Sequence, residues 1–269
     1  MKIVEKPQKG TEISRYGLVS AFLLPKDIVE TVKDLEMSEY NFEQEALTEY
    51  AKNNPLEVVI TKKEIMTFKY PWDILKTKNY LMKNLKGRID KNSSISKSAE
   101  IEGEVVVENG AKIMEGAKIK GPCYIGKNVK VGTNALLRSG ADLEENVSVG
   151  AFTEIKNSLL GSDTTIHSGF VGDSIIGSNC KIGSGFTTAN RKIDRSQIEV
   201  EVKGAKVGTG LTSFGAIVGN DVKIGIKVST MPGVIIGNNS LIGPSTSIFK
   251  NVPSDAKYYT KFQEIVEKN

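Results

Sequence analysis

The residues best suited to chemistry lie in the middle of the sequence, between Arg138 and Asn190. His167 is the only histidine of the 269 residues, and imidazole is the side chain that most readily exchanges a proton near neutral pH. Arg138 carries a planar guanidinium that can bind phosphate through paired hydrogen bonds, and Lys156 adds a second cation. Residues of these types suit a general base and an anion-binding site. A lone histidine or a surface cation is more often idle, so their functional interpretation depends on the motifs around them.

These residues are placed on a strict six-residue repeat. A smaller residue, such as Ala99, Ala111 or Cys123, precedes each large aliphatic residue by two positions. The large residues of the uninterrupted part are Ile95, Ile101, Val107, Ile113, Ile119, Ile125, Val131, Leu137, Leu143, Val149 and Ile155. A period of six fits neither a helix nor a plain strand. It is typical of a solenoid, in which short strands turn alternate side chains inward and three strands complete a coil of about 18 residues.

The position of a residue in this repeat predicts where its side chain points. Arg138, Lys156 and His167 each directly follow an inward aliphatic residue, so their side chains are expected to leave the coil. The repeat shortens by one residue in places after residue 155, breaks over 189–206 and resumes as far as Ile248. We predict a loop excursion at 189–206, with Asn190 at its edge, and such loops often carry function.

Two further segments flank the solenoid, which we place at residues 89–252. Residues 1–88 predict a partial α/β segment, with strands at 16–24 and 56–60 and helices at 26–35, 42–52 and 71–85. Residues 253–269 alternate aromatic or aliphatic residues with charges, which predicts a C-terminal capping helix or tail.

Composition narrows the classes of function. Apolar residues make up 39% and charged residues 25% of the chain, as in ordinary globular proteins. The sequence has no apolar run of about 18 residues and no signal peptide at its start, so we expect a cytoplasmic protein without a membrane partner. The net charge of +4 is spread along the chain, which argues against a nucleic-acid partner. Cys123 and Cys180 fall on inward positions, where they are expected to pack as small apolar residues rather than bind metal.

Five short motifs carry a resemblance to a known family. They are Leu137-Arg138-Ser139-Gly140-Ala141, Thr153-Glu154-Ile155-Lys156, His167-Ser168-Gly169-Phe170-Val171-Gly172-Asp173, Ile182-Gly183-Ser184-Gly185 and Thr187-Thr188-Ala189-Asn190. In order and spacing the chain resembles the acetyltransferase half of archaeal bifunctional sugar-1-phosphate nucleotidyltransferase/acetyltransferases, members of the hexapeptide-repeat family. The resemblance implies a left-handed parallel β-helix, a homotrimer with sites between protomers, and acetyl-CoA as acyl donor. The implied reaction is N-acetylation of an amino-sugar phosphate, such as glucosamine-1-phosphate, in nucleotide-sugar biosynthesis.

The resemblance also implies roles for individual residues. His167 would be the general base, and Arg138, Lys156, Phe170 and Asn190 would place the sugar phosphate. Ser184, Ala216 and Gly243 would contact coenzyme A. This sequence departs from the family in two ways: Phe170 replaces the usual Tyr, and Ser196 and Glu199 replace lysines of the loop. The identity of the acceptor sugar therefore stays open.

A second resemblance concerns the N-terminal segment. Ile3-Val4-Glu5-Lys6-Pro7 and Pro71-Trp72-Asp73-Ile74-Leu75 look like the second half of a sugar-1-phosphate nucleotidyltransferase domain, in which the Glu-Lys pair contacts sugar and phosphate. The Gly-rich phosphate loop of that family's first half is not in this sequence, and Thr67 or Phe68 stands where the family has a metal-binding Asp. We expect no nucleotidyl transfer by this chain alone, whether the chain is a natural short form or a fragment.

Two main functions remain open from the sequence, besides an acyltransferase that uses another acyl donor or acceptor. The first is a trimeric acetyltransferase. The second is a non-catalytic structural or regulatory trimeric subunit, or a fragment of a bifunctional enzyme, which the missing nucleotidyltransferase half, Phe170 and the lost loop lysines favour. An active free homotrimer would distinguish the first from the second.

Overall fold

The computed structural model describes residues 4, 8–19, 21–33, 35, 41–63, 65–263 and 265–267. The chain divides into two compact units, residues 1–65 and residues 66–269. None of the helices in the described ranges is both long and apolar enough to cross a membrane.

The first unit is helical where it is described. It contains α1 (Ile28–Lys33), a π-helix η1 (Asn41–Ala46) and α2 (Leu47–Asn53). Its small core consists of Ile28, Leu47 and Tyr50, and the Tyr50 hydroxyl donates to the Asp27 carboxylate at 2.9 Å. The helices predicted at 26–35 and 42–52 are therefore confirmed in outline.

The two strands predicted in this unit are wrong. Among the described residues of 16–24 and 56–60 there is no strand, and Tyr16, Leu23 and Val58 are 73%, 101% and 67% exposed. An apolar run becomes a strand only where a partner strand satisfies its backbone groups, and the described residues of this unit offer none. The partial α/β segment is thus α-helical in its described part. Glu5 and Lys6 of the nucleotidyltransferase-like motif lie outside the described residues.

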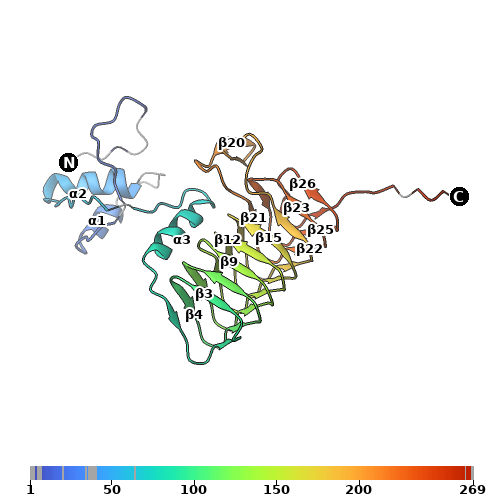
Figure 1. The fold of residues 1–269 in the computed structure, drawn as a ribbon. Coiled ribbons are helices and arrows are strands. Elements are labelled where there is room, and N and C mark those ends of the chain that lie inside the picture. The colour runs from blue at the N-terminus through green and yellow to red at the C-terminus, as the bar shows by residue number, and fades with distance from the viewer. Residues whose placement is uncertain are drawn as a thin grey trace. The chain divides into compact units, whose positions relative to one another are not determined.

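The second unit is a parallel β-solenoid with three sheets, one for each side of a prism (Figure 1). Sheet A contains β1 (Arg88–Ile89), β4 (Val105–Val107), β7 (Cys123–Ile125), β10 (Asp142–Leu143), β13 (Leu159–Leu160), β16 (Ile175–Ile176), β21 (Ala216–Val218) and β24 (Val234–Ile236). Sheet B contains β2 (Ser94–Ile95), β5 (Lys112–Ile113), β8 (Lys130–Val131), β11 (Ser148–Val149), β14 (Thr165–Ile166), β17 (Lys181–Ile182), β22 (Lys223–Ile224), β25 (Leu241–Ile242) and β27 (Lys257–Tyr258). Sheet C contains β3 (Glu100–Glu102), β6 (Lys118–Lys120), β9 (Leu136–Arg138), β12 (Glu154–Lys156), β15 (Gly169–Gly172), β18 (Phe186–Thr188), β23 (Ser229–Thr230) and β26 (Ser247–Ile248).

The register of these strands confirms the predicted repeat. Leu143 pairs with Ile125 one coil earlier, which is a step of 18 residues, whereas Val171 pairs with Ile155 after the predicted shortening, a step of 16. Every large position of the series from Val107 to Ile248 is at most 4% exposed, and both cysteines are fully buried. Each buried aliphatic side chain contributes roughly 1.5–3 kcal/mol, so the inward column accounts for the stability of the solenoid.

The excursion from the solenoid is longer than predicted. The chain leaves sheet C after β18 and returns only at β21, and between them β19 (Glu199–Val202) and β20 (Ala205–Gly208) form an antiparallel hairpin. Residues 207–215 therefore belong to the excursion as well.

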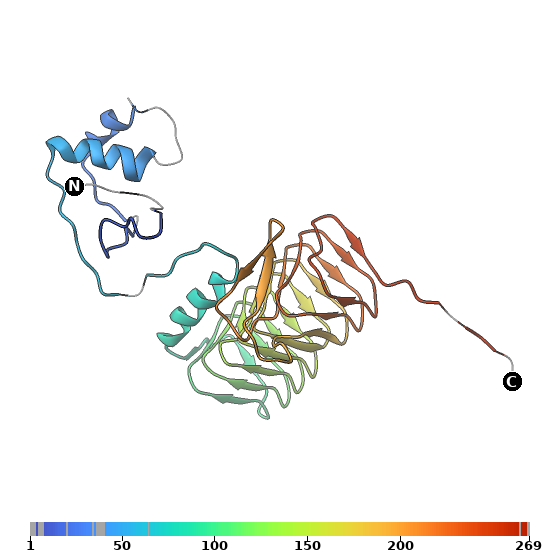
Figure 2. The same ribbon diagram turned by 90° about the horizontal axis from the view of Figure 1, so that it is seen from above.

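The outer face of sheet A is covered by α3 (Asp73–Lys83) and by this hairpin (Figures 1 and 2). Trp72, directly before α3, is 2% exposed, stacks on Tyr70 with ring centroids 4.5 Å apart, and meets Phe214 edge-on at 6.4 Å. These rings pack in one cluster with Ile175 and Ile217, which point outward from sheet A. The predicted helix at 71–85 is confirmed, but it belongs to the solenoid unit, so the structural boundary falls at residue 65 rather than 88.

The C-terminal segment differs from the prediction. Lys257 and Tyr258 form β27 at the end of sheet B, where Tyr258 pairs with Ile242 and continues the inward column. After β27 the chain leaves the solenoid as an extended segment (Figure 1). Residues 253–263 and 265–267 contain no helix, so the predicted capping helix is wrong for the described residues, and only the tail remains.

Candidate functional site

His167 lies at the corner where sheet B leads into sheet C, and the other coils from Gly132 to Gly243 carry a glycine at this corner. Its amide donates to Ile182 of the next coil at 2.9 Å. In the coil before, a Cβ at Gly150 would stand 1.9 Å from the His167 carbonyl oxygen, so only glycine allows this close stacking. Gly183, Gly225 and Gly243 occupy the same corner in the following coils, each donating its amide to the next.

The imidazole of His167 is free on the surface. His167 is exposed and directly follows buried Ile166, as the repeat predicts. In the described part of the chain no hydrogen bond or ion pair engages its side chain. Beside it, the hydroxyls of Ser168 and Ser184 are hydrogen-bonded at 2.6 Å across two coils. His167 and the predicted cofactor residue Ser184 are therefore neighbours along one corner.

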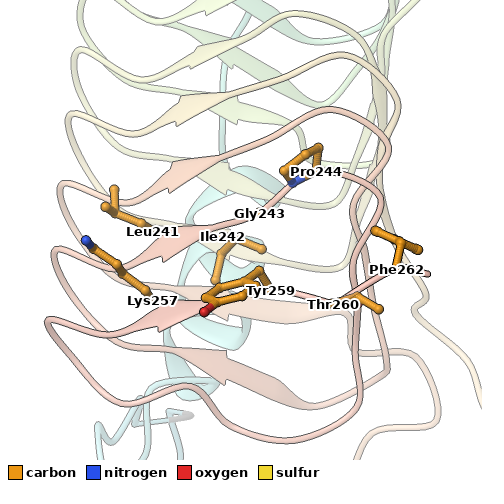
Figure 3. A pocket seen from close by; sticks show the side chains of 8 residues that line it. All are labelled: Leu241, Ile242, Gly243, Pro244, Lys257, Tyr259, Thr260 and Phe262. Atoms are coloured by element: carbon orange, nitrogen blue, oxygen red, sulfur yellow. The ribbon is translucent and has the colours of Figure 1, made fainter. Parts of the chain in front are cut away.

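The same corner leads to a pocket at the C-terminal end of the solenoid. Gly243 is three coils beyond His167, or about 14 Å at the usual spacing of parallel strands. It lines a cavity of about 390 Å³ (Figure 3) with Leu241, Ile242, Pro244, Lys257, Tyr259, Thr260 and Phe262. The walls are mainly apolar, and Lys257 adds a cation. The structure thus places two of the three predicted cofactor residues on one line with the histidine.

Ala216 is not on this corner. It is the first residue of β21 in sheet A, and it is fully buried at an inward position. It fits the small-residue series of the core, whereas its predicted contact with coenzyme A has no support in the geometry of this protomer.

The two predicted cations lie side by side on sheet C. Arg138 and Lys156 are paired residues on the adjacent strands β9 and β12. Arg138 is held by Glu154, with Nε 2.7 Å from a carboxylate oxygen, and about a third of its side chain is exposed. Both side chains leave the coil as predicted, but each also has an acidic partner.

Lys156 belongs to a buried polar cluster around Asp173. The Lys156 ammonium is 2.6 Å from Asp173 Oδ2, and the Asn190 amide donates to the same oxygen at 2.5 Å. The Asn157 amide donates to Asp173 Oδ1 at 2.7 Å. Lys156, Asn157 and Asp173 line a pocket of about 370 Å³ together with Ser139, Gly140, Pro122 and the α3 residues Asn79, Met82 and Lys83. Two predicted acceptor-binding residues, Lys156 and Asn190, are thus brought together.

Phe170 borders this cluster. A Cβ at Gly172 would meet the Phe170 ring at 2.5 Å and the Asn190 amide nitrogen at 3.0 Å. The ring therefore lies over Gly172, beside Asn190, and it offers no polar atom. Its predicted contact with the acceptor stays a prediction.

Within one protomer, His167 and Lys156 lie at opposite edges of sheet C. Gly172 is the residue that pairs with Lys156, and it follows His167 by five positions, which is at most about 16 Å of extended chain. The imidazole and the ammonium thus start from opposite ends of the strands of sheet C.

Two buried titratable groups interact where α3 packs on the solenoid: Lys78 of α3 and Asp142 of β10. Burial raises the pKa of the Asp142 carboxyl to about 7, with repulsion from Glu144 adding to the effect and attraction to Lys78 opposing it. Burial lowers the pKa of the Lys78 ammonium to about 8, against the attraction of Asp142. Lys78 donates to the Gly140 carbonyl, to Asn79 at 2.9 Å and to Asn157 at 3.1 Å. It is thereby connected to the Asp173 cluster.

Asp173, Asn157 and Lys78 have no role predicted from the sequence. Asp173 was part of a quoted motif, but Asp and Asn recur at solenoid corners in the left-handed backbone conformation, as at Asn146, Asp163 and Asp173 itself (φ 50°). A corner acid with a structural role and one that holds a cation therefore look alike in the sequence. The described residues contain no cluster of three or more His, Cys, Asp or Glu side chains suited to a metal ion.

Comparison with known proteins identifies relatives of the solenoid. Residues 119–230 match the model of the GMPPB C-terminal domain, and residues 215–250 match the bacterial transferase hexapeptide model of six repeats. "Bifunctional protein GlmU" of Methanococcus aeolicus is 40% identical over 242 residues, which is 90% of this chain and 58% of that protein. The "Bifunctional sugar-1-phosphate nucleotidylyltransferase/acetyltransferase" of Sulfurisphaera tokodaii is 32% identical over 93% of this chain and 63% of its own length.

This chain spans about three fifths of those bifunctional relatives. It covers a larger share of the "Uncharacterized acetyltransferase YaiX" of Escherichia coli O6:K15:H31. That protein is 35% identical over 193 residues, which is 70% of this chain and 82% of the relative. Together with the solenoid fold, these matches show that the chain belongs to the hexapeptide-repeat acyltransferases, in the family that includes the acetyltransferase half of GlmU-like bifunctional proteins.

Proposed function

We propose that this protein is an acetyl-CoA-dependent N-acetyltransferase that acts on an amino-sugar phosphate of the glucosamine-1-phosphate type. One observation carries the proposal: the chain's only histidine is exposed on a glycine-lined corner that leads along successive coils to the Gly243 pocket. An extended acyl donor fits such a corner, because the absence of side chains lets it approach the backbone closely.

The proposed chemistry is attack of the sugar's amine on a thioester carbonyl. The C–N bond forms, the C–S bond breaks, and the sulfur leaves as a thiol once it has gained a proton. His167 takes the proton that the amine releases, which typically contributes ~10²–10⁴-fold to the rate. No other imidazole is available in the chain.

The acceptor's phosphate is assigned to Arg138 and Lys156. A guanidinium supplies paired donors to phosphate oxygens, and an ammonium has three N–H donors, of which the bond to Asp173 uses one. Asn190 and Phe170 would then border the sugar ring. The pocket beside Lys156, whose lining includes Asn157 and Asp173, gives the acceptor room next to these groups.

The acyl donor is assigned to the corner between Ser184 and Gly243. The residues present fit such a molecule: hydroxyls at Ser168 and Ser184, apolar walls at Ile242, Pro244 and Tyr259, and a cation at Lys257 for nucleotide phosphates. When bound there, the donor supplies the activated acyl group.

We further propose that the working molecule is a homotrimer. His167 and Lys156 lie at opposite edges of sheet C in one protomer, so a neighbouring protomer is needed to bring an imidazole to the acceptor. A threefold ring repeats the same heterologous interface and so forms three equal sites.

The test is a thiol-release assay with acetyl-CoA and a panel of hexosamine phosphates. We expect turnover with at least one of them and a loss of ~10²-fold or more in kcat for His167→Ala. The matched control is Lys118→Ala, which removes an exposed cation of sheet C that pairs only with Glu100. Full activity of His167→Ala, or no turnover with any acceptor, would contradict the proposal.

One observation favours the non-catalytic alternative. Both predicted cations already have acidic partners, Glu154 and Asp173, which weakens the positive potential available to a phosphate. A chain that trimerises and binds a sugar phosphate but never releases thiol would support a structural or regulatory subunit.

A further inference from the structure

Asp173 is an unusually buried acid for a surface corner. It directly follows β15, its backbone is left-handed with φ 50°, and its side chain is only 4% exposed. A buried carboxylate is tolerated only where donors replace the water it has lost. Its neighbours therefore determine how the carboxylate is oriented.

Both oxygens of Asp173 are taken by donors from neighbouring coils. Oδ2 accepts from the Lys156 ammonium at 2.6 Å and from the Asn190 amide at 2.5 Å. Oδ1 accepts from the Asn157 amide at 2.7 Å. One carboxylate thus joins the coil before it, which carries Lys156 and Asn157, to the start of the excursion at Asn190.

The contacts decide which atoms of Asn190 and Lys156 remain for a ligand. Asn190 gives its NH₂ group to Asp173, which turns its carbonyl oxygen away from the carboxylate as a free acceptor. Lys156 keeps two N–H donors. The pair therefore presents an acceptor for a sugar N–H or O–H group next to donors for a phosphate.

The network continues into α3. Asn157 accepts from the buried ammonium of Lys78 through its Oδ1 at 3.1 Å, while its amide donates to Asp173. Lys78 also binds the Gly140 carbonyl at the corner of the preceding coil. A helix outside the solenoid is thus in hydrogen-bonded contact with the group that orients Lys156 and Asn190.

We propose that Asp173 is a positioning residue for the acceptor, and that Lys78 of α3 supports it through Asn157. The carboxylate fixes Lys156 and Asn190 in the arrangement that fits an amino-sugar phosphate, and α3 is thereby a functional element of the acyltransferase unit. This inference rests on the proposed acceptor class and adds residues that need not touch it.

The experiment compares Asp173→Asn with wild type in the full-length chain. The isosteric amide keeps the shape but removes the charge. In either orientation its NH₂ group faces a donor, Asn157 on one side or Lys156 and Asn190 on the other. We expect the dissociation constant for glucosamine-1-phosphate, measured by calorimetry, to rise about tenfold or more. The KM for acetyl-CoA should stay within about twofold, because the corner of Ser184 is not part of this network.

A second readout does not depend on turnover. Lysine acylation footprinting with mass spectrometry should show Lys156 protected in wild type and several-fold more reactive in Asp173→Asn, with exposed Lys118 as internal standard. Lys78→Met removes the hydrogen bond from α3 to Asn157 and should weaken sugar-phosphate binding about threefold. This second variant tests the same network if Asp173→Asn does not fold. The matched control is Asp221→Asn, another left-handed corner acid that accepts from an asparagine, Asn179 at 2.7 Å.

The outcomes separate the two proposals. Equal sugar-phosphate dissociation constants for wild type and Asp173→Asn would overturn the positioning role, whatever the labelling of Lys156 shows. Binding that weakens as expected, in a wild-type chain that never releases thiol, would overturn the proposed activity alone.

Discussion

At the scale of single residues, the two cations of sheet C differ in how firmly they are held. The Lys156–Asp173 contact is 20% and 4% exposed, whereas about a third of each side chain in the Arg138–Glu154 contact is exposed. Exposed ion pairs contribute little to stability, so their cation readily exchanges its partner for another anion. Arg138 is therefore free to turn from Glu154 to a phosphate, whereas Lys156 stays in place, and in the proposed site it would fix the position of the acceptor.

A substitution at Phe170 should strengthen acceptor binding at the proposed site. Its ring lies over Gly172, beside the Asn190 amide, so a hydroxyl added at the ring's tip enters the polar cluster. A typical hydrogen bond contributes about 0.5–1.5 kcal/mol, so Phe170→Tyr should lower the acceptor KM by about two- to tenfold. Steady-state kinetics with varied acceptor would measure this, with the acetyl-CoA KM as the reference. An unchanged or raised acceptor KM would show that Phe170 does not face the acceptor.

At the scale of elements, the Pro-Trp motif has a structural role in this chain. The sequence associated it with nucleotide chemistry, but Trp72 is 2% exposed and anchors α3 to the outer face of sheet A with Tyr70 and Phe214. The Asp73 carboxylate accepts from the amides of Lys69 and Tyr70 at 2.9 and 2.8 Å, which fixes the turn into the helix. Since α3 carries Lys78, this anchor also positions the Asp173 cluster.

Removing the anchor should release α3. Trp72→Ala deletes a buried aromatic side chain, which typically costs about 3–5 kcal/mol. We expect a lower unfolding temperature and faster proteolysis near α3, while the solenoid keeps its β-sheet circular dichroism. Tyr80→Ala is the control, because Tyr80 is an aromatic residue of the same helix that is 37% exposed. Equal effects of the two substitutions would argue that Trp72 does not hold the helix.

The buried acid beneath α3 should make stability depend on pH. The pKa of Asp142 is raised to about 7 by burial, so the folded state binds a proton more tightly than the unfolded state between its ordinary pKa and about 7. Stability from this group therefore falls as pH rises through that window. Asp142→Asn removes the ionisation, so it should unfold at a higher temperature than wild type near pH 8, and the difference should vanish towards pH 4. Thermal melts between pH 4 and pH 8 would measure this. If the difference in unfolding temperature between Asp142→Asn and wild type were the same at every pH, Asp142 would not be the responsible group.

The solenoid could be predicted from the sequence because every coil repeats the same pattern of inward residues. From Val107 to Ile248 the inward positions recur every six residues, shortened to five in a few places and interrupted by the excursion, so one ambiguous residue is corrected by its neighbours. The coil at Lys257–Tyr258 was missed because an aromatic residue takes the aliphatic position. The docking of α3 was missed because it depends on outward residues such as Ile175 and Ile217, which come together only when the coils stack.

For the candidate site, the direction of the side chains could be predicted but their partners could not. The outward direction of His167, Arg138 and Lys156 follows from the repeat, and the structure confirms it. The partners of these residues do not follow, because Glu154 and Asp173 reach them across coils, and the choice of partner depends on side-chain geometry rather than on spacing.

At the scale of the whole molecule, one chain provides the parts of a site without closing it. The corner with His167 and Ser184, proposed for the acyl donor, lies at one edge of sheet C. The Asp173 cluster with Lys156, proposed for the acceptor sugar, lies at the other edge. A ring of three protomers would set the His167 corner of one protomer against the Asp173 cluster of the next. Each active site would then take its histidine from one chain and its lysine from another.

This arrangement predicts complementation between two inactive variants. In an equal mixture of His167→Ala and Lys156→Met chains, co-expressed so that they assemble at random, about three quarters of the trimers contain both variants, and each of these has one intact site of three. We therefore expect about a quarter of the wild-type activity from two chains that are each inactive alone. Mixing His167→Ala with the double variant that carries both substitutions should restore nothing, because no interface is then intact. If the site were formed within one protomer, the first mixture would be as inactive as the second, and the histidine and the lysine would have to meet across sheet C by another route.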